Sequence, residues 1–228
     1  PSCLGMEIVN NTDRVTRGDR ELWDELLQVV IPKGRNIWAF ADDDSEKLNE
    51  VGRSFEFFVL PENNEANVKK AMKDGNFFAA SKYYKTTDGV GDFDGDGNVP
   101  LVTGIKVDQK ANTITVATDS TRDCRVIEWI ADGKVIATGN TIDLNDYEKD
   151  LGCYIRFQMK GSGGVTYSQP FELQYKGRID KPVPSWALWV FKTEAGQKFM
   201  KFYHSHSFAL GALIAEKIRI LIEDNIKK

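Results

Sequence analysis

The order of apolar segments between Met6 and Tyr84 constrains the fold of this chain most strongly. Apolar residues recur at helical spacing in Arg20–Val30 and again in Asn63–Lys73, so both segments are predicted helices. Short apolar segments predict strands at Met6–Asn10, Ile37–Ala41, Phe55–Leu60 and Phe77–Ala80. Because strands and helices alternate, this part of the sequence favours a parallel α/β arrangement.

The pattern changes at about Lys85. Residues 86–100 are rich in Gly and Asp and indicate a linker or an ion-binding loop. Six short strand-like segments follow between residues 105 and 174, and Asp132-Gly133 predicts a two-residue hairpin turn between two of them. We therefore expect an antiparallel β-sandwich over residues 101–176, with Trp129 and Tyr154 in its core. Residues 177–228 contain a Pro- and Trp-rich strap and an apolar helix, Phe208–Lys227.

These segments predict an α+β protein with several domains. The expected boundaries are 1–85 for the α/β part, 86–100 for the acidic loop, 101–176 for the sandwich and 177–228 for the strap and terminal helix. A net charge of −4 with both signs interspersed does not indicate a polyanion-binding surface, so nucleic acid is not expected as a main ligand. The apolar residues of 208–222 are interrupted by charges, so no transmembrane span is expected.

The three cysteines, Cys3, Cys124 and Cys153, lie far apart in the sequence and form no CxxC pair. A cysteine zinc site is therefore not expected. The odd number favours free thiols in a reducing compartment, and the sequence predicts a cytoplasmic location.

A run of acidic residues, Asp42 to Asp44 followed by Glu46, stands where the Ile37–Ala41 strand ends. Ligands of parallel α/β folds bind beyond the carboxyl ends of the strands. Carboxylates two residues apart, such as Asp44 and Glu46, can both reach one metal ion from a loop. The alternative is a solvated acidic turn with no ligand.

The acidic loop begins like a calcium-binding EF-hand loop. Asp92, Asp94 and Asp96 occupy the first, third and fifth positions, and Asn98 supplies the seventh. The twelfth position holds Thr103 rather than a bidentate Glu. Either a weak calcium site or a flexible acidic linker accounts for this pattern.

The two histidines of the chain, His204 and His206, stand two residues apart near the C-terminus. On a strand, this spacing points both imidazoles to one face, which is a suitable geometry for a metal ion. One interpretation is that they supply imidazoles to the acidic cluster. The other is a chance pair in a turn before the terminal helix.

In their order, the Trp23-Asp24 helix, the apolar strand, the acidic cluster and the Ala71–Ser81 segment resemble the C-terminal part of a PHP domain. This is the "polymerase and histidinol phosphatase" family of metal-dependent phosphoesterases. Residues 5–10 (GMEIVN) resemble the family's "EVYN"-like strand. The "YxR" and "YSQPF" segments at residues 154–156 and 167–171 resemble the β-domain that follows the PHP domain in a group of bacterial proteins.

The resemblance implies the closing part of a PHP-type α/β barrel, with the remaining metal ligands either before Pro1 or lost from this copy. It also implies a zinc, iron or manganese centre that hydrolyses a phosphorylated small molecule. Asp44 matches the Asp of the family's Asp-x-His pair, whereas Glu46 stands at the His position. That departure supports an alternative function, a catalytically silent, calcium-stabilised binding or scaffold protein. A third possible function is that of a partner-binding adaptor that forms homo-oligomers through its C-terminal helix.

Overall fold

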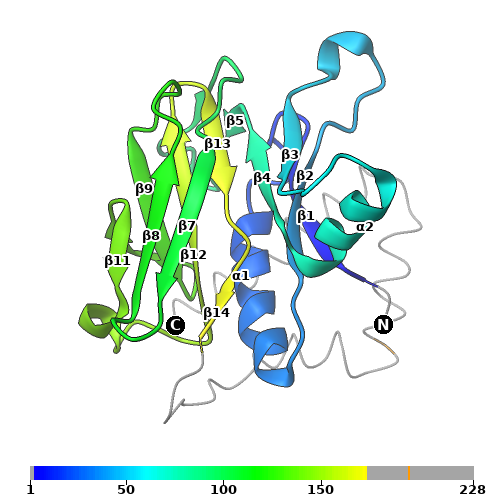
Figure 1. The fold of residues 1–228 in the computed structure, drawn as a ribbon. Coiled ribbons are helices and arrows are strands. Elements are labelled where there is room, and N and C mark those ends of the chain that lie inside the picture. The colour runs from blue at the N-terminus through cyan, green and yellow to red at the C-terminus, as the bar shows by residue number, and fades with distance from the viewer. Residues whose placement is uncertain (1–2, 174–194, 196–228) are drawn as a thin grey trace. The chain divides into compact units, whose positions relative to one another are not determined.

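A seven-stranded sheet built from distant parts of the chain is the centre of the fold (Figure 1). The computed structural model describes residues 3–173 and 195. Six strands follow one another in the order β10-β9-β12-β13-β4-β3, and β14 pairs with β12. Their bounds are β3 Ser54–Phe58, β4 Phe77–Ser81, β9 Val126–Ala131, β10 Lys134–Thr138, β12 Tyr154–Gly161, β13 Gly164–Tyr167 and β14 Phe171–Glu172. The β4–β13 pair joins the N-terminal part of the chain to the later strands.

Strands β1 (Gly5–Asn10) and β2 (Trp38–Asp42) form a parallel pair, which the sequence pattern predicted. Helix α1 (Asp19–Val30) and the short helix η1 (Ile31–Lys33) connect them. Trp23 and Leu27 of α1 are fully buried against β1 and β2 because they lie on one helical face. Gly34 ends the helical segment in the left-handed region, with φ of 71°.

The predicted PHP-type α/β barrel is wrong for the described residues. They contain two α-helices, α1 and α2 (Glu65–Asp74), and β3 pairs with β4 in the antiparallel direction. The physical reason lies in α2, where Ala71 is the one buried side chain. A helix that buries so little cannot cover a sheet face, as a parallel crossover requires. The chain instead returns beside β3, with Phe58 opposite Phe77.

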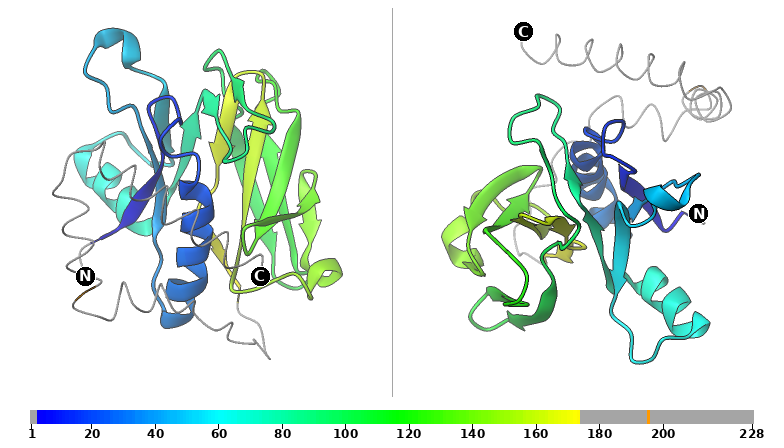
Figure 2. Two further views of the ribbon diagram at one scale, coloured as in Figure 1. Left: turned by 180° about the vertical axis from the view of Figure 1, so that it is seen from behind. Right: turned by 90° about the horizontal axis from the view of Figure 1, so that it is seen from above.

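The strands after residue 100 are antiparallel. A second sheet, in the order β11-β8-β7, packs on one face of the large sheet, and α1 lies on the other face (Figure 2). Its strands are β7 Val102–Asp108, β8 Thr113–Thr118 and β11 Thr141–Asp143, followed by the short helix η3 Leu144–Tyr147. The predicted turn is confirmed, because Asp132 and Gly133 have φ of 49° and 74° between β9 and β10.

The prediction for the sandwich core is half right. Trp129 is buried between the two sheets, with Phe157 at 5.4 Å between ring centroids. Tyr154 instead belongs to the core on the α1 side. Successive residues of a strand face opposite sides, so Ile155 and Phe157 of β12 point to the sandwich and Tyr154 points away from it.

A bulge between β13 and β14 is hydrogen-bonded to β2 and so connects β2 to the large sheet. Both strands pair with β12, and the register shifts by one residue between them. In the bulge, the Gln169 side chain forms the two hydrogen bonds that a neighbouring strand would form with Ala39. Ala39 N donates to Gln169 Oε1 and Gln169 Nε2 donates to Ala39 O, both at 2.9 Å. The edge of β2 that faces away from β1 is thus paired by a side chain.

Two segments of the prediction fall outside the described residues. They are the Pro- and Trp-rich strap and the terminal helix, and His204 and His206 lie with them. Among residues 3–173 and 195, no helix has the length and apolar character needed to cross a membrane.

Candidate functional site

Carboxylates gather near the carboxyl end of β2, which Asp42 ends, and Glu7 lies opposite Phe40 in the middle of β1. Burial raises the pKa of Glu7, and the negative charges of Asp42 and Asp44 raise it further, against a lowering hydrogen bond from Asn10 Nδ2 (2.9 Å). Burial raises the pKa of Asp42 too, with Asp43 and Asp44 adding to the effect. These four acids therefore share one field of negative charge, which attracts cations.

Glu56 of β3 extends this acidic region. Its carboxylate accepts a hydrogen bond from Ala41 N (2.9 Å), one residue before the end of β2. Burial raises the pKa of Glu56 to about 7, and the charges of Asp42 and Asp43 contribute to the increase. Glu7 and Glu56 were not predicted from the sequence as site residues. The signal that could have identified them is an acidic residue in an otherwise apolar strand.

The two metal ligands predicted at this edge, Asp44 and Glu46, are both exposed. Asp44 takes a left-handed backbone conformation (φ of 45°), and Glu46 follows it in a loop between β2 and β3. The backbone N–H of Glu46 donates to Glu50 Oε2 (3.0 Å), where the short helix η2 (Leu48–Glu50) ends. The structure therefore places Asp44 within the acidic region and Glu46 further along the loop.

Asp43 has a structural task in the same loop. Its two carboxylate oxygens accept hydrogen bonds from three successive backbone N–H groups, those of Gly52 (2.7 Å), Arg53 (2.6 Å) and Ser54 (2.8 Å). Asp43 thus closes the base of the β2–β3 loop and positions the start of β3. This arrangement leaves Asp44, and not Asp43, as the exposed carboxylate after β2.

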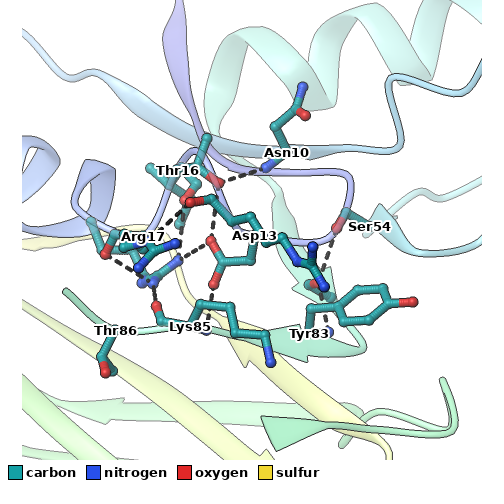
Figure 3. Close-up of polar contacts among 12 residues, drawn as sticks. Asn10, Asp13, Thr16, Arg17, Ser54, Tyr83, Lys85 and Thr86 are labelled. Atoms are coloured by element: carbon teal, nitrogen blue, oxygen red, sulfur yellow. Dashed lines mark hydrogen bonds and ion pairs between the residues drawn. The ribbon is translucent and has the colours of Figure 1, made fainter. Parts of the chain in front are cut away.

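A buried ion pair holds the loop that follows β1 (Figure 3). Asp13 is fully buried and its Oδ1 lies 2.8 Å from Arg20 Nη1 of α1, while Asp13 Oδ2 accepts the Lys85 N–H at 2.7 Å. Thr16 donates to the same Asp13 carboxylate and accepts the Asn10 N–H. The sequence signal for this pair is Arg20, a charged residue on the apolar face of α1.

The calcium-like loop forms a small hairpin in which its acids are already engaged. Strands β5 (Tyr83–Tyr84) and β6 (Phe93–Asp94) pair across it. Asp92 accepts hydrogen bonds from Thr86, Asp94 pairs with Lys85, and Asp96 accepts the Asn98 N–H at 2.8 Å. Each carboxylate therefore stabilises the hairpin by a different contact.

The described residues do not supply a complete metal centre. Over residues 3–173 and 195, no three His, Cys, Asp or Glu side chains lie close enough together to hold a metal ion. The donors at the β1–β2 edge are carboxylate oxygens, which suit Mg²⁺, Mn²⁺ or Ca²⁺ better than the softer metals. The multi-metal centre that the PHP resemblance implies thus does not fit these residues alone.

Comparisons of this chain with protein-family models, with curated proteins and with solved structures found no match. The resemblance to the PHP family therefore stays a prediction from the sequence.

Proposed function

We propose that this chain belongs to a metal-dependent phosphoesterase of the PHP type and acts on a phosphorylated small molecule. The observation that carries the proposal is the field of negative charge shared by Glu7, Asp42 and Asp44 near the carboxyl end of β2. In parallel arrangements this edge is where ligands bind. A divalent cation there relieves the repulsion between the carboxylates.

In this proposal the acidic residues either face the cation or hold the loop that carries Asp44. Asp44 presents an exposed carboxylate to the cation, and Glu7 contributes charge from a half-buried position beside Asn10. Asp43 holds the loop that carries Asp44. This proposal requires further ligands in addition to those of the described residues.

The test is binding of Mn²⁺ and Zn²⁺ by calorimetry, together with hydrolysis of p-nitrophenyl phosphate. We expect Asp44→Asn to weaken Mn²⁺ binding at least about tenfold, the cost of one lost charged ligand at roughly 1.4 kcal/mol per factor of ten. The matched control is Asp146→Asn, which removes an exposed carboxylate from η3. Glu46→His should strengthen binding of Zn²⁺ and raise hydrolysis. Equal Mn²⁺ binding by Asp44→Asn and Asp146→Asn would reject the site.

A second function, a catalytically silent scaffold stabilised by calcium, is favoured by the position of Glu46. At the family's His position stands an exposed acid whose backbone N–H is held by Glu50 of η2. This alternative predicts that Ca²⁺ alone binds, that Asp94→Asn abolishes this binding and that Asp44→Asn leaves it unchanged. Phosphate-ester hydrolysis by the full chain would exclude it.

The proposed location is the cytoplasm. All three cysteines are free in the structure, and Cys153 is buried with its Sγ 3.7 Å from Leu27 O. Free thiols are usual in a reducing compartment. Labelling of unfolded, freshly isolated protein with a thiol reagent tests this proposal, and three reacted thiols are expected.

A further inference from the structure

Strand β12 carries a polar row of side chains on its α1 side. Tyr154, Arg156, Gln158 and Lys160 alternate with Ile155, Phe157 and Met159, which face the sandwich core. Tyr154 and Arg156 are almost completely shielded from solvent, with exposed fractions of 0% and 3%. Buried polar atoms are costly unless each has a hydrogen-bond partner.

Most of this polar row is satisfied by protein partners. The Asp24 carboxylate of α1 accepts hydrogen bonds from Tyr154 Oη (2.8 Å), Arg156 Nε (2.7 Å) and Arg156 Nη2 (2.6 Å). Gln158 Nε2 donates to Glu128 Oε2 (2.7 Å), and Lys160 Nζ lies 2.9 Å from the same oxygen. Each bond joins β12 to α1 or to the neighbouring strand β9.

Two buried polar atoms, one in this row and one on the neighbouring strand β13, have no hydrogen-bond partner among the described residues. They are Arg156 Nη1 and the hydroxyl Oη of Tyr167, a side chain with an exposed fraction of 0%. Tyr167 stands opposite Gln158 in the β12–β13 register, so Arg156 is its diagonal neighbour on the same face. Such Cα atoms are roughly 7–8 Å apart, within reach of two long side chains.

Charged side chains surround the Tyr167 hydroxyl. Burial raises the pKa of Tyr167, whereas the positive charges of Arg20 and Arg156 lower it. Arg20 Cζ lies 5.9 Å from the centroid of the Tyr167 ring. Both arginines have an aspartate partner, Asp13 and Asp24, so the surroundings of the phenol carry little net charge.

We propose that Tyr167 Oη and Arg156 Nη1 share one internal water molecule beneath α1. A water accepts the Arg156 N–H and bonds the phenol as donor or acceptor, which satisfies both atoms at once. Internal waters make two to four hydrogen bonds to polar groups of this kind. The balanced charges favour a neutral ligand over a small anion.

The direct test is a crystal structure of the full chain at a resolution that shows ordered water molecules. A water within hydrogen-bond distance of both Tyr167 Oη and Arg156 Nη1 supports the assignment, and an empty position overturns it. Crystals grown in bromide distinguish the two small ligands. An anomalous bromide peak at this position shows an anion site and overturns the water assignment.

The sign of a stability change gives an independent test. If the water is present, Tyr167→Phe removes one of its partners, and the unfolding equilibrium constant in urea should rise about fivefold. If the hydroxyl is unsatisfied, its removal leaves stability unchanged or higher. Tyr154→Phe is the matched control, because it removes a hydroxyl whose bond to Asp24 is established. An equal or higher midpoint for Tyr167→Phe than for the wild-type protein refutes the proposal.

Discussion

The buried pair between Asp24 and Arg156 yields the sharpest test of how this fold is held together. Asp24 is the acceptor of three hydrogen bonds, two of them from the guanidinium group. The side chains of both residues are at most 4% exposed. Arg156 also lies over the Trp23 ring, with Cζ 5.0 Å from its centroid. Neither charge can therefore be screened by solvent in the folded state.

Asp24→Asn should destabilise the protein by about 3–5 kcal/mol. The amide keeps one acceptor oxygen, but its NH₂ group faces a donor, and the Arg156 charge remains buried without a counter-charge. Since domains are stable by only about 5–15 kcal/mol, this loss is a large part of the total. Urea unfolding followed by tryptophan fluorescence measures it.

Two further variants complete the experiment. Glu65→Gln breaks an exposed pair with Lys69, and we expect a loss of at most about 1 kcal/mol. The double variant Asp24→Leu with Arg156→Met should be more stable than Asp24→Asn alone, because no buried charge remains. A loss for Asp24→Asn as small as that for Glu65→Gln would refute the reasoning.

Three other predictions rest on single side chains. Gln169→Ala removes both hydrogen bonds to Ala39 and should cost about 2 kcal/mol in urea unfolding; a change below about 0.5 kcal/mol contradicts the side-chain pairing of β2. Asp43→Ala should speed hydrogen exchange at the three amides that it binds, and unchanged exchange would contradict its role in the loop. Glu56 is one pH-sensitive group: because its pKa rises from 4.5 to about 7 on folding, the folded state binds the extra proton and stability falls as pH rises through this range. Glu56→Gln should reduce that fall between pH 5 and pH 8, and an unchanged slope would contradict the assignment.

Local patterns in the sequence predicted where most elements lie, but not how all of them pair. The helical spacing of Trp23 and Leu27 and the Asp132-Gly133 turn depend on neighbouring residues, so a sequence displays them directly. Strand β4 pairs with β13, whose residues lie far along the chain, as well as with β3. An apolar strand shows that it will be buried and does not show its partner, which is why the barrel prediction failed.

The site could be predicted only in part for a similar reason. Acids after a buried strand were visible, and the structure places Asp44 in an acidic region. The different roles of Asp43 and Asp44 follow from the backbone conformation of the loop, which adjacent identical residues do not reveal. Glu7 joins the region through the parallel register that sets it opposite Phe40 of β2, a contact between distant segments.

Pairing between β4 and β13 can form only late in synthesis on the ribosome. Ser81 pairs with Val165, so the whole segment between them must be added before this edge of β4 can be paired. Because ribosomes add only about 5–20 residues per second, that interval lasts several seconds at least. During this time the nascent chain carries an unpaired strand edge beside the aromatic residues of β3 and β4. Chaperone demand during translation is thus expected to peak before β13 is synthesised, and to end when that strand emerges.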